Sequence, residues 1–334
     1  MDSWGEGFDF GVRRLLPGLW ICIWIRAAGV PLECAAHIPD RAMKNESSTV
    51  NRSEAEQKVA DLVQRSGILT RTAILSSLNA KVDQVDGSLD EIIQQVQADS
   101  ELVAKLMIVA NSAWFGTRTK VKKVDEAYSR LGQTEFYHAV VTSVLRLALG
   151  ETGPLCAGYW AHVDIVGRMN QLVAQHLAPG TEPTAFLLGL LHDVGIPIMS
   201  RWAVDYTYLA EDALGTGIDS TNNEAECYGY NHALVSMELA RLWGFSPALA
   251  SAIPFHHQYT LANAPEESRK LLANLMLTER IAGLCQGQVK AIFASDNERR
   301  LLREISVTFG VDENGINGVI AEIERLFLLR ESAA

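Results

Sequence analysis

Apolar residues recur at helical spacing along most of the chain. Within 100–116, for example, Leu102, Leu106 and Val109 share one helix face, and Gly116 ends the pattern. Ser53 is followed three residues later by a Glu, which is the capping box that opens a helix. The pattern predicts helices over 53–67, 88–99, 100–116, 124–149, 160–177, 183–200, 202–214, 231–243, 246–256, 265–285, 297–309 and 313–329. Strand-like alternation is absent from the middle of the chain, so the predicted fold class is all-α.

The first 42 residues do not follow this pattern. They contain an apolar run of about eleven residues, Leu15 to Ile25, preceded by two arginines and closed by Arg26. The run is too short to span a membrane, although its outline is that of a signal peptide. Three interpretations stay open: a signal or anchor, a genuine extra segment, or upstream sequence that precedes a natural start at Met43.

Composition narrows the class of protein. The chain has 334 residues, of which 48% are hydrophobic and 21% charged, as in a globular protein with a sizeable core. The net charge of −11 argues against a nucleic-acid partner, because phosphate contacts need clustered Lys and Arg. The five cysteines form no C-x-x-C pair, so we expect no disulfide framework and a cytoplasmic location. We expect no membrane span.

One apolar run carries an adjacent imidazole and carboxylate. In "AFLLGLLHDVGIPIM" (185–199) the polar residues are His192 and Asp193. A carboxylate in such a run costs several kcal/mol unless something pairs with it. Other polar side chains in or beside apolar helices could supply that partner, namely His162, His232, His256, His257 and Glu279. Imidazoles and carboxylates are the usual ligands of zinc, manganese and iron. Spacing alone leaves a metal site and a set of hydrogen-bonded core histidines equally open.

A series of motifs in order resembles the HDOD proteins, the HD-related output domain of bacterial signalling, within the HD superfamily of metal-dependent phosphohydrolases. The motifs are "VQADSELVAKLMIVANSAWFG" (96–116), "VDEAYSRLG" (124–132), "YWAHVDIVG" (159–167), "FLLGLLHDVG" (186–195), "ECYGYNHALVSMELARLWGF" (226–245) and "AIPFHHQ" (252–258). Together they cover roughly residues 70–285. The chain departs from the family pattern at Ser100, Val163, Asn231 and Ser236, and it has Glu279 where the superfamily usually has Asp.

The resemblance implies a domain organisation. A poorly ordered or mis-annotated extension (1–52) precedes the N-terminal helical part of the HDOD domain (53–150). An HD-like helical part (151–290) carries the His/Asp cluster, and a C-terminal helical extension (291–334) completes the chain. The two amphipathic helices of the extension would dock on the bundle or form a homodimer contact.

The resemblance also implies a ligand set for a divalent metal ion, which would be Fe, Mn, Zn or Mg. His162, His192, Asp193 and Glu279 are the candidate ligands of one ion. His232, His256 and His257 would hold a second ion or line a ligand pocket. Glu226, six residues before His232, could orient an imidazole from behind or be a solvated charge at a helix start.

Two functions of different kinds, one regulatory and one enzymatic, are compatible with these observations. The resemblance favours a regulatory protein of signal transduction that binds a signalling protein or a nucleotide and performs no turnover. The alternative is a metal-dependent phosphohydrolase or phosphodiesterase, with His192 and Asp193 at its catalytic centre. The Gly-Tyr-Pro tripeptide expected of an HD-GYP phosphodiesterase is absent from the sequence.

Overall fold

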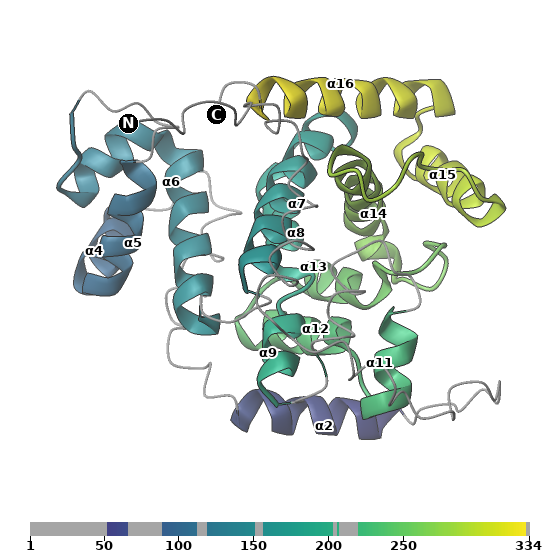
Figure 1. The fold of residues 1–334 in the computed structure, drawn as a ribbon, viewed down its shortest axis with the longest axis horizontal. Coiled ribbons are helices and arrows are strands. Elements are labelled where there is room, and N and C mark those ends of the chain that lie inside the picture. Colours follow the sequence, from purple (N-terminus) through teal and green to yellow (C-terminus); the bar gives the residue numbers. More distant parts are fainter. Residues whose placement is uncertain are drawn as a thin grey trace, which may run out of the picture.

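A computed structural model of the chain describes residues 52–65, 89–111, 119–150, 156–202, 206 and 220–331. Their regular elements are all helices, which confirms the all-α class (Figure 1). The α-helices are α2 (Arg52–Arg65), α4 (Leu89–Ala98), α5 (Ser100–Ala110), α6 (Val124–Leu149), α7 (Cys156–Leu177), α8 (Glu182–Leu191), α9 (Gly195–Trp202), α11 (Ser220–Tyr228), α12 (His232–Leu242), α13 (Pro247–Ala252), α14 (Arg269–Cys285), α15 (Asp296–Phe309) and α16 (Glu313–Glu331). Two 3₁₀ turns, η4 (Ile253–Phe255) and η5 (Glu266–Ser268), join them.

Two of the sequence predictions fall outside the described residues. They are the extension before α2 and nearly all of the helix expected over 202–214. The predicted division at residue 150 lies between α6 and α7, and it stays a prediction.

Helices α7 and α8 form the centre of the molecule (Figure 1). Helices α4, α5 and α6 pack on one another beside this pair, and α14 packs against both α7 and α8. At one end α2 lies against α12, and at the opposite end α16 crosses α7 and α14. The predicted C-terminal helices therefore dock on the bundle, where Leu301, Ile305, Ile316 and Ile323 are buried.

Glycines allow the central helices to approach closely. A Cβ on Gly189 of α8 would lie 2.6 Å from the Cα of Gly167 on α7. A Cβ on Gly195 would overlap the backbone carbonyl of His232 at the start of α12. Behind this contact, Gly195 N donates a hydrogen bond to Ser236 Oγ over 2.8 Å. Ser236, a departure from the family pattern, thus ties α12 to α9.

The helix predicted over 183–200 is two helices. It breaks at His192–Val194, where a turn separates α8 from α9. Both helices are buried on nearly all sides, so the apolar pattern continues through the break and the spacing gives no sign of it. The turn places His192 and Asp193 where two helix ends meet.

The stretch Glu182–Trp202 is long and apolar enough to cross a bilayer by length and composition. However, 83% of its most apolar window is buried inside the protein, which accounts for its hydropathy.

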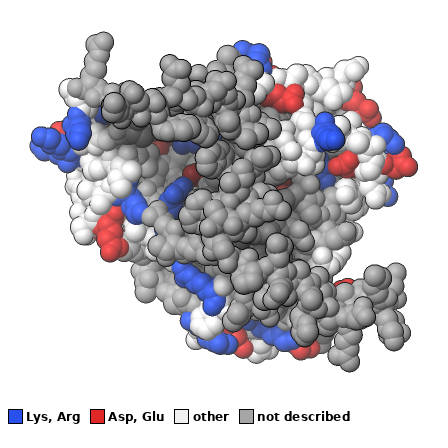
Figure 2. All heavy atoms as spheres, in the orientation of Figure 1, with Lys and Arg blue, Asp and Glu red and all other residues white. Residues whose placement is uncertain are grey.

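On the surface, acidic and basic side chains lie side by side over α15 and α16 (Figure 2). The expectation that nucleic acid is not a partner stays a prediction.

The Gly189–Gly167 contact predicts the effect of one methyl group. We expect Gly189→Ala to lower the free energy of unfolding by about 1–3 kcal/mol, because the added Cβ must push α8 away from α7. Gly318→Ala is the matched control, since Gly318 lies in α16 with no atom within 4 Å of an added Cβ. The control should gain about 0.5–1 kcal/mol from its higher helix propensity. Urea denaturation measures both, and equal effects of the two substitutions would contradict the tight crossing.

Candidate functional site

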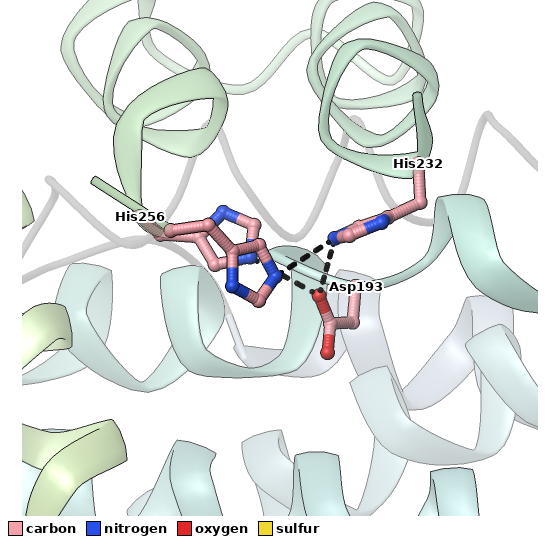
Figure 3. A group of neighbouring side chains, drawn as sticks. Asp193, His232 and His256 are labelled. Atoms are coloured by element: carbon pink, nitrogen blue, oxygen red, sulfur yellow. Dashed lines mark hydrogen bonds and ion pairs between the residues drawn. The ribbon is translucent and has the colours of Figure 1, made fainter. Parts of the chain in front are cut away.

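The Asp193 carboxylate lies at the centre of a buried group of imidazoles, 1% exposed, in the turn between α8 and α9. Its Oδ1 is 3.3 Å from His232 Nε2 and 3.3 Å from His256 Nε2. Figure 3 shows both rings directed at the carboxylate from two other helical segments. Its Oδ2 is 3.1 Å from His192 Nε2 and 3.6 Å from His162 Nε2 on α7. We call these residues, with His257 and Glu279, the Asp193 cluster.

Three imidazoles of the Asp193 cluster are fixed from behind through their Nδ1 atoms. His192 Nδ1 lies 2.8 Å from the carbonyl of Gly189, and His256 Nδ1 lies 2.6 Å from the carbonyl of Ile253. A carbonyl only accepts, so Nδ1 is the donor in both rings. His232 Nδ1 lies 2.8 Å from Glu224 Oε2 in the same way. When each ring is neutral, its Nε2 is therefore a lone pair that faces Asp193, as in metal-ligating histidines.

The spacing of the donor atoms fits a cation. For metal–ligand bonds of about 2.1 Å, neighbouring ligand atoms lie about 3.0–3.4 Å apart. The contacts of Asp193 with its four imidazoles are all between 3.1 and 3.6 Å. Three buried atoms, His192 Nε2, Asp193 Oδ1 and His256 Nε2, have no hydrogen-bond partner among the described residues. Imidazole lone pairs and a carboxylate repel one another when no proton lies between them. The arrangement is therefore unfavourable unless protons or a metal ion supply positive charge.

The ligand atoms fall into overlapping groups in which all members lie within 4.8 Å of one another. The groups are His162 with His192 and Asp193, Asp193 with His232, His256 and His257, and His192 with His256 and Glu279. The two oxygens of Asp193 face different imidazoles, Oδ2 facing His192 and Oδ1 facing His232, so this carboxylate could contribute to both of the first two groups. The structure thus brings together every candidate ligand named from the sequence.

Glu279 reaches the Asp193 cluster from α14. Its Oε1 lies 3.4 Å from His192 Nε2, which is within the spacing of neighbouring ligand atoms around one metal ion. A buried polar network fixes α14 on α7: Asn274 donates to Asn170 Oδ1 over 2.7 Å, and Thr278 Oγ1 donates to the same oxygen over 2.9 Å. Thr278 immediately precedes Glu279, and the network therefore sets the position of this carboxylate.

The charges of the cluster depend on one another. Burial opposes ionisation of Asp193, but the charge of His192 and the contacts of the other imidazoles hold its pKa well below its usual range. Burial also opposes the imidazolium of His232, yet Glu224 and Asp193 raise its pKa to about 10. Burial lowers the pKa of His162 to about 4. Without a metal ion, protonation of His232 helps to balance the carboxylates. A divalent ion would displace this proton.

The carboxylate that orients His232 is Glu224. Both of its oxygens contact His232 Nδ1, and Oε2 also accepts the His232 backbone N–H over 2.7 Å. Tyr206 donates to its Oε1 over 2.7 Å. Of the two interpretations of Glu226, the structure favours the solvated charge, because this residue is exposed, two positions further along α11. Nothing in the sequence distinguishes Glu224 from Glu226, since the packing of α11 against α12 decides which of the two turns inward.

Comparison with models of protein families identifies the family of this chain. The model of the HDOD domain matches residues 68–259, more than half of the chain. The chain belongs to the HDOD family. The match ends before Glu279, so the placement of this residue in the HDOD site comes from the structure alone.

Solved structures share the fold of this HDOD protein. An HDOD domain protein of unknown function from Geobacter sulfurreducens is 20% identical, with a TM-score of 0.57 over 76% of this chain and 90% of its own. A candidate phosphohydrolase from Shewanella amazonensis SB2B is 25% identical, with a TM-score of 0.55 over 75% and 91%. A candidate signal transduction protein from Marinobacter aquaeolei VT8 has a TM-score of 0.63 at 16% identity over 85% and 66%.

A curated relative is an uncharacterized protein of Treponema pallidum (strain Nichols). It is 23% identical over 220 residues, which are 64% of this chain and 42% of the relative. The HDOD chain thus spans about two fifths of the length of this relative.

The buried contacts of Asp193 predict a large loss of stability when the carboxylate is removed. In the presence of EDTA, we expect Asp193→Ala to lower the free energy of unfolding by about 3–5 kcal/mol, because it leaves buried imidazoles unpaired. Glu226→Ala, which removes an exposed carboxylate of α11, should stay within about 0.5 kcal/mol of the wild type. Urea denaturation measures both losses. A loss for Asp193→Ala no larger than that of the control would show that the carboxylate is not needed to balance the cluster.

Proposed function

We propose that this chain is a regulatory HDOD protein that binds one or two divalent metal ions at the Asp193 cluster. It acts by binding a signalling protein or a nucleotide, and it performs no turnover. The observation that carries the metal site is the set of imidazoles whose Nδ1 atoms are held from behind, so that their Nε2 atoms converge on one buried carboxylate.

In this proposal the residues divide between two ions. His162, His192, Glu279 and Asp193 Oδ2 would hold the first ion. His232, His256, His257 and Asp193 Oδ1 would hold the second. Such an ion supplies Lewis acidity to an oxygen of a bound ligand or water. The side chains of this protein orient the ligand atoms and keep bulk water away from them.

Three of the imidazoles are placed to act as metal ligands and not as a general acid or base. The Nδ1 atoms of His192, His232 and His256 are occupied by Gly189, Glu224 and Ile253. A ring held at both nitrogens, by a hydrogen bond and by a metal ion, has no free position for proton transfer. The similarity of fold to a candidate signal transduction protein of Marinobacter is consistent with a regulatory role.

The second candidate is a metal-dependent phosphohydrolase, and three observations are consistent with it. A cavity reaches the cluster beside His162, His257 and Glu279, so a ligand could approach the ions from this side. His162 Nδ1 is buried and has no hydrogen-bond partner among the described residues, so this ring is not held from behind as the other three are. The candidate phosphohydrolase of Shewanella is 25% identical to this chain.

Metal content and turnover separate the two functions. We expect the purified protein, treated with EDTA and then dialysed against Mn²⁺, Fe²⁺, Zn²⁺ or Mg²⁺, to retain stoichiometric metal by elemental analysis. Asp193→Asn should lower the metal affinity by about 10–100-fold, because it removes the central charge with little change of size. Glu226→Gln is the control on the exposed face of α11 and should retain the metal of the wild type.

The same samples are assayed with phosphate monoesters and diesters. We expect no hydrolysis above that of the Asp193→Asn variant. Turnover by the wild type that disappears in Asp193→Asn and persists in Glu226→Gln would overturn the regulatory proposal in favour of the hydrolase. A folded wild type that retains none of the four metals would overturn the metal site.

A further inference from the structure

A cavity of about 110 Å³ opens beside the Asp193 cluster. The cluster lines its inner end through His162, His257 and Glu279. Its other walls include Tyr259, Arg280 and Gln288. One ordered water needs roughly 10–15 Å³ of such space, so the cavity holds a group of several heavy atoms.

Arg280 is a buried cation in the wall of this cavity, 7% exposed. No carboxylate oxygen lies within 4.0 Å of its guanidinium among the described residues. Its one hydrogen bond there runs from Nη1 to the carbonyl of Met276 over 2.8 Å, and its Nε–H is buried without a partner. The ring of Tyr259 lies under the guanidinium, 5.9 Å from Cζ to the ring centroid. Buried charges are normally paired in direct contact, whereas Glu279 and Glu298 act on this guanidinium only at longer range.

The two acidic residues of the cavity are engaged elsewhere. Glu279 Oε1 faces His192 Nε2 at 3.4 Å. Glu298 Oε2 accepts the backbone N–H groups of Ala294 and Ser295, over 3.0 and 3.1 Å, as part of the capping box of α15. Neither carboxylate therefore neutralises Arg280 by direct contact, and an anion from solution would meet unsatisfied donors at this point.

We infer that Arg280 receives the phosphate group of a small-molecule ligand in the cavity beside the Asp193 cluster. A guanidinium presents a planar fork of N–H donors that matches the oxygens of a phosphate. The cavity places this fork in the same wall as Glu279 and beside the imidazoles of His162 and His257. The phosphate would lie between Arg280 and the cluster, and the rest of the ligand would extend past Val289 and Ile292.

The inference rests on the proposed function in so far as the phosphate occupies the same site. It narrows that function, because it selects a phosphorylated small molecule as the ligand. Free phosphate and a phosphate ester offer the same chemistry to Arg280, and the experiment distinguishes them.

Isothermal titration of the full-length protein, in EDTA and after metal loading, uses inorganic phosphate and adenosine monophosphate as probes. We expect the wild type to bind at least one probe and Arg280→Gln to weaken it at least tenfold with unchanged metal content. Arg280→Lys keeps the charge without the fork and should fall between the two. Arg241→Gln, which removes an exposed arginine on α12, is the control and should bind as the wild type does. Tighter binding of adenosine monophosphate than of phosphate identifies an ester as the ligand, and the reverse order identifies free phosphate.

Equal affinity of the wild type and Arg280→Gln for the probe would overturn the inference, as would a folded wild type that binds neither probe. Circular dichroism establishes that the variants fold. If Arg280→Gln does not fold, Arg280→Lys decides, and unchanged affinity in that variant overturns the inference. Phosphate binding that depends on Arg280 in a protein that retains no metal would sustain this inference while the proposed metal site fails. If the protein retains metal but binds phosphate equally well without Arg280, the proposed metal site stands and the inference about Arg280 fails.

Discussion

A single buried carboxylate sets the constraint on which this structure depends. Asp193 is 1% exposed, and its Oδ1 has no hydrogen-bond partner among the described residues. Its charge must be balanced, and four imidazoles from three other parts of the chain and from its own neighbour lie at 3.1–3.6 Å to do so. The helices around the site are arranged so that these rings can converge.

Two kinds of contact make that convergence possible. The glycines at 189 and 195 let α8 and α9 approach α7 and the start of α12 until backbone touches backbone. Polar contacts then fix the rings: Glu224 holds His232 with the help of Tyr206, and the Asn170–Asn274–Thr278 network positions α14 and so Glu279. Close packing sets the distance between the helices, and the polar contacts set the direction of each side chain.

The site combines three imidazoles held from behind with a buried guanidinium that no carboxylate contacts directly. The Nε2 atoms of His192, His232 and His256 already point at Asp193 in the conformation described, so a metal ion would find its ligands preorganised. Arg280, in the wall of the adjoining cavity, has no such partner. A set of preorganised ligand atoms beside a buried guanidinium is an arrangement suited to holding a phosphorylated molecule, and the inferred role of Arg280 relies on it.

The sequence by itself determined the helical class, most helix positions, and the candidate ligands, because amphipathic spacing and isolated polar residues in apolar runs are local properties of the chain. The sequence did not predict the break between α8 and α9. Both helices are buried on nearly all sides, so the alternation of apolar and polar positions that would mark a helix end is missing. Only the tertiary structure decided that Glu224 rather than Glu226 contacts His232, and that Arg280 is buried with its Nε–H unpaired among the described residues. These outcomes depend on which side chains turn inward when distant helices pack, and no local pattern encodes that choice.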